Sequence, residues 1–182
     1  MAKVWHVANF FITLGQQQAD SEKGDQVSNL RLQKLLYFAQ GCYLARHGKP
    51  LFDDELCAWK FGPVVPEVYE KYKRFENGGI PAAEEFTPED LTPDEFALLL
   101  DVAREYDKYS TSKLISMTHQ PGTPWAQTSQ SQAIPIDIIK SHFDAMLPLA
   151  SFEDALRKIE VITPGRDEEG YAVLPGSAED WG

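Results

Sequence analysis

The sequence lacks the short motifs that identify common catalytic and cofactor sites. It has no glycine-rich phosphate-binding loop and no Gly-x-Ser-x-Gly nucleophile motif, and no histidine or cysteine pair stands at the spacing of a zinc site. The histidines are His6, His47, His119 and His142, and none has a second metal ligand at such a spacing. The sequence therefore predicts a protein without a metal, a cofactor or an enzymatic activity.

Long apolar stretches are missing as well. No stretch approaches the roughly 20 apolar residues that cross a bilayer, and the first apolar segment, 4–14, has neither a basic leader nor a small-residue cleavage site. The two cysteines, Cys42 and Cys57, are not closely spaced, so we expect reduced core residues and no disulfide. These features predict a cytoplasmic protein with no membrane partner.

Basic residues are in the minority. The chain has 17 Lys and Arg against 28 Asp and Glu, which gives a formal net charge of −11. Nucleic-acid binding needs a basic surface that displaces counterions from phosphates, so neither a nucleic-acid partner nor a role as a transcriptional autoregulator is expected. An acidic surface suits a basic protein partner through long-range attraction, and solubility alone is the alternative explanation.

Seven segments carry apolar residues at helical spacing, and a chain of 182 residues is long enough to pack them around one core. The segments are 4–14, 30–46, 66–76, 92–106, 110–118, 135–147 and 151–159. Segment 30–46 is apolar on nearly every side, which is typical of a helix surrounded by others. We predict a mainly α fold: one compact domain of about seven helices around this central helix, with a short extended segment near 55–60.

Helix boundaries are marked by capping residues. Ser28 or Asn29 can cap the central helix, and Gly48 suits the left-handed residue that follows its end. Thr92 and Glu95 form a capping box around Pro93. In the first helix His6, Asn9 and Thr13 predict a water-facing stripe, and the polar segment 15–27 predicts a surface loop.

The last twenty residues break the helical pattern. We expect a helical domain over residues 1–162 and an acidic C-terminal tail over 163–182. Segments 160–162 and 171–174 can pair as a hairpin around Pro164 and Gly165, and a tail that is disordered until it binds a partner is the alternative.

Polar residues interrupt the apolar surface of the central helix at Gln33, Lys34 and Gln40. A lysine is rarely buried without a partner, because its lost hydration costs several kcal/mol. We expect Lys34 to reach the surface; a backbone carbonyl or a carboxylate of segment 53–55 is the alternative acceptor. Aromatic residues beside Gly and Pro, Trp59 and Trp125 among them, suit either interface anchors or core packing.

One ordered block of residues resembles a known family. The residues are Leu32-Gln33-Lys34-Leu35-Leu36-Tyr37-Phe38-Ala39-Gln40-Gly41, then Leu44-Ala45, Gly48, Pro50-Leu51-Phe52, Ala58-Trp59, Gly62-Pro63-Val64 and Val68-Tyr69. The block resembles the Panacea, or SocA-like, antitoxin domain, a phage-associated family, and His119 with Pro124-Trp125 resembles its second block. The similarity covers roughly residues 4–159.

The resemblance implies a mainly helical protein that neutralises a cognate toxin by direct binding. In one branch of the family the antitoxin instead acts as an adaptor that delivers its toxin to a bacterial protease. The partner-binding residues carried over from the motif are Gln33, Lys34, Tyr37, Trp59, Gly62, Pro63, Tyr69 and Trp125. They either contact the toxin or hold the domain together. A small hydrolase-type enzyme that uses His47, His119 and the Asp53-Asp54 pair is a further alternative.

Overall fold

The computed structural model describes residues 1–21, 26–76, 78–81, 87–146, 165–166 and 172–173. The chain divides into two compact units, Met1–Ser151 and Phe152–Gly182. In the second unit β3 (Gly165–Arg166) and β4 (Ala172–Val173) pair antiparallel. The second strand of the predicted hairpin, 171–174, contains β4. The strand that pairs with it is β3, which begins at Gly165, and not the segment 160–162 that the sequence suggested. Segment 160–162 and the predicted helix 151–159 lie outside the described residues.

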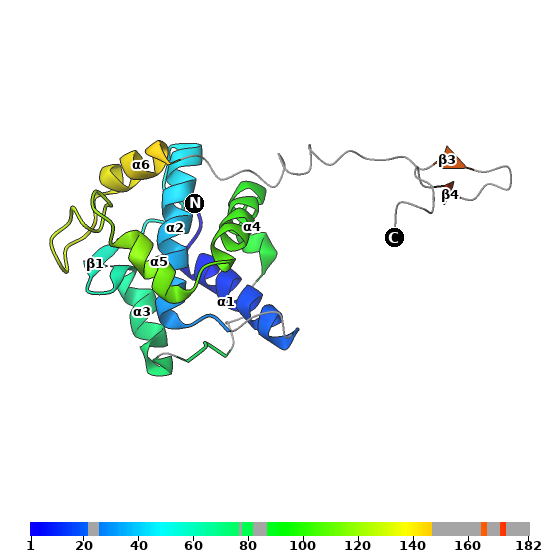
Figure 1. Cartoon of the computed structure of the whole chain (residues 1–182), viewed down its shortest axis with the longest axis horizontal. Helices are drawn as coiled ribbons and strands as arrows, with labels where there is room; N and C mark the ends of the chain where they lie inside the picture. The colour runs from blue at the N-terminus through cyan, green and yellow to red at the C-terminus, as the bar shows by residue number, and fades with distance from the viewer. Residues whose placement is uncertain (22–25, 77, 82–86, 147–164, 167–171, 174–182) are drawn as a thin grey trace, which may run out of the picture. The chain divides into compact units, whose positions relative to one another are not determined.

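The first unit is helical, which confirms the mainly α prediction (Figure 1). Its described helices are α1 (Val4–Asp20), α2 (Asn29–His47), α3 (Pro66–Tyr72), α4 (Pro93–Asp107), α5 (Thr111–Thr118) and α6 (Ile136–Ala145). Two short 3-10 turns are η1 (Lys73–Phe75) and η2 (Pro88–Asp90). The extended segment predicted near 55–60 is β1 (Cys57–Trp59), which pairs antiparallel with β2 (Gly62–Val64). No described helix has the length and apolar character needed to cross a bilayer.

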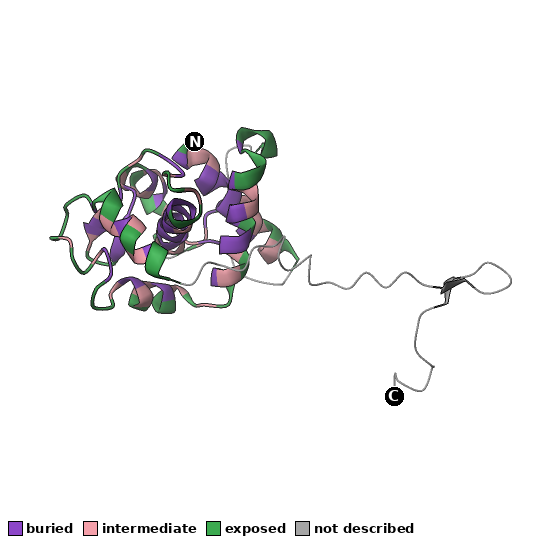
Figure 2. Cartoon of the chain, turned by 90° about the horizontal axis from the view of Figure 1, so that it is seen from above, coloured by how far each residue is buried: buried purple, intermediate pink, exposed green. Residues whose placement is uncertain are grey.

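Helix α2 lies at the centre of the first unit, as predicted. It contacts α1, α3, α4, α5, α6 and β2, and in Figure 2, where it is seen end-on, it is coloured as buried along most of its length. Gly41 brings α6 close: a Cβ atom there would lie 2.2 Å from Cε2 of Phe143. Helix α2 therefore forms the axis on which the other elements pack.

The predicted caps are formed. The Ser28 hydroxyl accepts a hydrogen bond from the Arg31 amide at the start of α2. Gly48 follows α2 in the left-handed conformation, with φ 69°. Thr92 and Glu95 exchange the two hydrogen bonds of a capping box at the start of α4. These local sequence signals therefore set where the helices begin and end.

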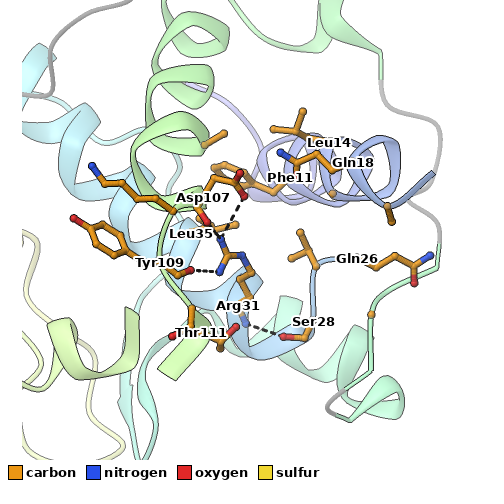
Figure 3. A pocket seen from close by; sticks show the side chains of 17 residues that line it. Phe11, Leu14, Gln18, Gln26, Ser28, Arg31, Leu35, Asp107, Tyr109 and Thr111 are labelled. Carbon is orange, nitrogen blue, oxygen red and sulfur yellow. Dashed lines mark hydrogen bonds and ion pairs between the residues drawn. The ribbon is translucent and has the colours of Figure 1, made fainter. Parts of the chain in front are cut away.

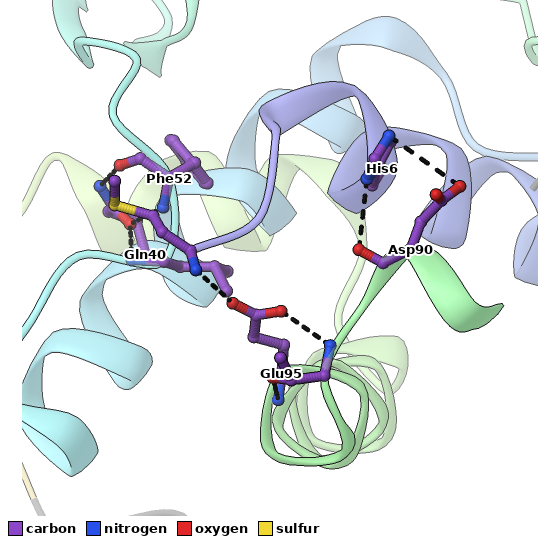
Figure 4. Close-up of polar contacts among 8 residues, drawn as sticks. His6, Gln40, Phe52, Asp90 and Glu95 are labelled. Atoms are coloured by element: carbon purple, nitrogen blue, oxygen red, sulfur yellow. Dashed lines mark hydrogen bonds and ion pairs between the residues drawn. The ribbon is translucent and has the colours of Figure 1, made fainter. Parts of the chain in front are cut away.

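The prediction for the first helix was wrong in two respects. Helix α1 continues to Asp20, six residues beyond the predicted end, because Gly15 packs against the buried Val27 and the polar turn that follows is rich in glutamine, a good helix former. Asn9 is 6% exposed and so does not face water. Helix α4 packs on α1, and Asp90 of η2 lies beside His6, with its carbonyl oxygen 3.3 Å from Nδ1 (Figure 4).

Candidate functional site

The amide of Gln40 holds the chain that leaves α2. Its Oε1 accepts hydrogen bonds from the backbone amides of Leu51 (2.8 Å) and Phe52 (3.2 Å), and its Nε2 donates to the Phe52 carbonyl (2.9 Å) (Figure 4). The Gln40 side chain is buried. One side chain thus satisfies three backbone groups, which allows this loop to be buried against α2 without losing hydrogen bonds.

Gln33, also on α2, binds the backbone at the start of α3. Its Oε1 accepts a hydrogen bond from the Val65 amide (2.9 Å), and its Nε2 donates to Oδ1 of Asn29 (3.1 Å). Asn29 in turn donates from Nδ2 to the Tyr69 carbonyl (3.0 Å). Two polar residues of the central helix therefore fix the position of α3, on which Tyr69 stands.

Lys34 is buried completely, so the prediction that it reaches the surface was wrong. The residue is 0% exposed, and its Nζ donates a hydrogen bond to the Pro63 carbonyl at 2.8 Å. Strand β2, which carries Pro63, packs on α2. Burial lowers the pKa of Lys34 from its ordinary 10.5 to about 7. Of the two alternative acceptors for Lys34, a backbone carbonyl and a carboxylate of segment 53–55, the structure has the carbonyl.

The hairpin can pack this closely because residue 62 is a glycine. Gly62 has φ 103°, and a Cβ atom there would lie 2.7 Å from both Nζ of Lys34 and Oγ1 of Thr118. A glycine with positive φ directly after a hairpin turn also suits the twist of the paired strands. Gly62 therefore joins the central helix, β2 and the end of α5 at one point.

Two aromatic residues, His119 and Trp125, contact the backbone carbonyls at the turn of the hairpin. Nε1 of Trp125 donates a hydrogen bond to the Trp59 carbonyl at 2.7 Å. Nε2 of His119 lies 3.2 Å from the Lys60 carbonyl, and the His119 and Trp125 ring centroids are 3.7 Å apart. The second block of the family motif thus contacts the first block, although nearly sixty residues or more separate them in sequence.

Phe61 stands at this turn and is 56% exposed. The ammonium of Lys60 lies 5.3 Å from the centroid of the Phe61 ring. On the same hairpin Trp59 is half-buried and meets Tyr69 edge to face, with ring centroids 5.0 Å apart. The sequence analysis missed Phe61. The signal that identifies it is an aromatic residue placed directly before a Gly-Pro pair between two short strands.

The structure separates the eight motif residues into two groups. Five are buried, namely Gln33, Lys34, Tyr37, Gly62 and Pro63, and three are half-buried, namely Trp59, Tyr69 and Trp125. Tyr37 lies away from the hairpin, because its ring packs against Phe143 of α6 with centroids 5.4 Å apart. The other seven belong to the hairpin or to the side chains that hold it.

A cavity of about 970 Å³ lies elsewhere, between the C-terminal half of α1, the first turn of α2 and the junction of α4 with α5 (Figure 3). Arg31 crosses it and donates hydrogen bonds to the carbonyls of Tyr109 (2.7 Å) and Tyr106 (3.2 Å). Burial lowers the pKa of Arg31, and Asp107 opposes that shift. The guanidinium thus satisfies carbonyl groups at the C-terminal end of α4. None of the eight motif residues lines this cavity.

The residues proposed for a hydrolase-type site do not form a metal-binding group. Within the described part of the chain no three His, Cys, Asp or Glu side chains come together as metal ligands. His47 packs against Tyr43 with ring centroids 4.3 Å apart, whereas His119 packs against Trp125. The two histidines therefore have separate structural neighbours. Cys42 and Cys57 are both free thiols.

The first unit is thus a helical domain in which buried polar side chains of α2 fix a short hairpin, and the turn of that hairpin exposes one aromatic ring, that of Phe61. The family model described as "Antitoxin SocA-like, Panacea domain" matches residues 32–126, and the chain belongs to this family. These residues contain α2 from its fourth residue on, the hairpin, α3, α4, α5 and Trp125, so the match covers the network described above except for Asn29.

The chain is similar to the protein named Antitoxin SocA from Caulobacter vibrioides (strain NA1000 / CB15N). The two are 34% identical over an alignment of 112 residues that covers 54% of this chain and 58% of that relative. The chain thus spans little more than half the length of the curated relative that it matches. No solved structure matches it.

Proposed function

We propose that this chain is an antitoxin that neutralises a toxin protein by holding it in an inactive complex. The observation that carries the proposal is membership of the SocA-like Panacea family over residues 32–126. The proposal includes no catalytic step by this chain. The polar motif side chains Gln33 and Lys34 form buried hydrogen bonds within the domain, an arrangement that supports a rigid binding surface.

The eight motif residues take two roles in this proposal. The five buried ones act inside the domain: Gln33, Lys34, Gly62 and Pro63 keep the hairpin and α3 in place, and Tyr37 packs on Phe143 of α6. The three half-buried rings of Trp59, Tyr69 and Trp125 contribute to the surface that contacts the toxin. Half-buried aromatic residues are common in protein interfaces, because they offer a large apolar area at little conformational cost. We also propose that the tail, 163–182, adjusts the choice of partner, and that the complex forms in the cytoplasm.

Co-expression with the product of the neighbouring gene tests the proposal. That product should stop growth when expressed alone, and this chain should restore growth and co-purify with it. The matched control is Leu36→Asp, which places a charge in the core at α2 and should unfold the domain and abolish rescue. A chain that neither restores growth nor co-purifies would refute the proposal.

The half-life of the toxin separates neutralisation from delivery to a protease. Under the proposal the half-life is unchanged or longer when the chain is present, because binding protects a folded partner. A half-life that shortens with the chain, and recovers in a strain that lacks the protease, identifies the chain as a proteolytic adaptor.

A further inference from the structure

The turn of the β1–β2 hairpin, Lys60 and Phe61, presents an exposed aromatic ring on a rigid base. Phe61 is 56% exposed, while Ala58 and Pro63, which are paired across the hairpin, are buried. A protein gains little by exposing a phenyl ring, since burying one contributes on the order of 2–3 kcal/mol. The exposed position of Phe61 therefore leaves apolar area at the turn that a partner can bury.

The chain on both sides of Phe61 is fixed by side chains from other elements. Trp125 donates to the carbonyl two residues before it, and His119 lies in hydrogen-bond distance of the carbonyl one residue before it. Gly62 and Pro63, directly after it, are buried, and Lys34 donates to the Pro63 carbonyl. A turn whose backbone is held this way needs no reordering on binding, so more of the burial of the Phe61 ring appears as affinity.

We propose, on the basis of the proposed function, that Phe61 is the anchor of the toxin interface, that is, the residue whose burial contributes most to binding. It inserts into an apolar pocket on the toxin, and the half-buried Trp59 and Tyr69 contact the rim of that pocket. Anchors of this kind are a few aromatic residues surrounded by contacts that exclude water. The proposal takes the toxin to be basic overall, because the whole chain carries a net charge of −11 and charge complementarity accelerates association, although the charge beside Phe61 itself is the ammonium of Lys60.

The experiment uses the full-length chain and the purified product of the neighbouring gene as the probe, and it measures affinity and association rate. Phe61→Ala should weaken binding by about tenfold or more, and its melting temperature should match the wild type because the ring is exposed. The matched control is Leu100→Ala on α4. Leu100 is also an exposed apolar residue, at 36%, and its loss should change affinity by less than about twofold.

Phe61→Leu keeps an apolar side chain at the turn and should retain an intermediate affinity, which guards against an unexpected folding defect in Phe61→Ala. The association rate of the wild type should fall as salt rises, because opposite charges are screened. A rate that rises with salt would exclude a basic partner.

The outcomes separate the anchor from the proposed function. If the wild type binds the probe and Phe61→Ala binds equally well, the anchor is wrong and the antitoxin proposal stands. If the wild type neither binds nor rescues growth, both are wrong. If the chain alone forms a dimer that Phe61→Ala dissociates, the pocket belongs to a second copy of this chain and the toxin anchor is refuted.

Discussion

The amine of Lys34 and the carbonyl of Pro63 form a hydrogen bond of 2.8 Å, 29 residues apart along the chain and out of contact with solvent. This bond joins the central helix to the hairpin that carries the exposed ring. A buried ammonium is costly unless it is well paired, whereas a neutral amine still donates to a carbonyl. The stability of this contact is therefore linked to the protonation of one lysine.

Stability should depend on pH through Lys34. Its pKa is about 7 in the fold and 10.5 ordinarily, so between these values the unfolded chain binds one more proton than the folded chain. The free energy of unfolding contributed by Lys34 should therefore rise with pH from about 7 to 10.5 and be constant below that window. Relative to Lys34→Met, the wild type should gain roughly 2 kcal/mol between pH 7 and pH 9 in chemical denaturation.

The comparison with Lys34→Met is needed because other groups titrate in the same range. Burial raises the pKa of Cys42 to about 12, and such groups contribute equally to both proteins. Parallel pH profiles for the wild type and Lys34→Met would show that Lys34 is charged in the fold throughout.

Replacing Gln40 should be strongly destabilising. Gln40→Leu keeps the size of the side chain but leaves the amides of Leu51 and Phe52 without their acceptor. The variant also removes the donor to the Phe52 carbonyl, and these three unpaired buried groups should cost at least about 2–4 kcal/mol in the free energy of unfolding. The control is Gln17→Leu, at an exposed position of α1, which should change stability by less than about 0.5 kcal/mol. Equal losses in the two variants would contradict the role of Gln40.

The contact between α2 and α6 should be sensitive to one methyl group. Gly41→Ala places a Cβ atom 2.2 Å from the Phe143 ring if nothing moves. Overpacking of this kind should lower stability by about 1–3 kcal/mol, measured by thermal or urea unfolding. In a Phe143→Leu background the same substitution should cost less, because the ring edge is gone; additive effects would show that the two residues do not interact.

The indole of Trp125 should matter for both stability and binding. Trp125→Phe keeps an aromatic ring but removes the N–H that donates to the Trp59 carbonyl. The variant should lose about 1 kcal/mol of stability and also bind the toxin more weakly, because the hairpin turn is less well fixed. Trp5→Phe, at a half-buried tryptophan of α1, is the control and should leave binding unchanged. Normal stability and binding in Trp125→Phe would refute this role.

Much of the fold was predictable because it depends on local signals. The apolar periodicity located six of the described helices, and the caps at Ser28, Gly48 and Thr92 set boundaries that the structure confirms. The first helix was underestimated because its last turns are polar. They are helical through the contact of Gly15 with Val27, which periodicity does not report.

The site was predictable only as a set of residues. The resemblance selected Gln33, Lys34, Trp59 and Trp125, but their partners lie in other parts of the chain. Phe61 was missed because an aromatic residue before a Gly-Pro pair marks a turn without telling whether its ring is exposed or buried. Its exposure follows from the rings and carbonyls that fix the turn around it.

The sequence by itself determined that this chain is helical, that segment 30–46 forms its core and that it is acidic, because composition, helical spacing and caps act over a few residues. Only the tertiary structure decided that Lys34 is buried, that Trp125 holds the hairpin and that Phe61 faces solvent. Those outcomes depend on donors and acceptors that meet through packing, and the spacing of residues along a chain does not record such meetings.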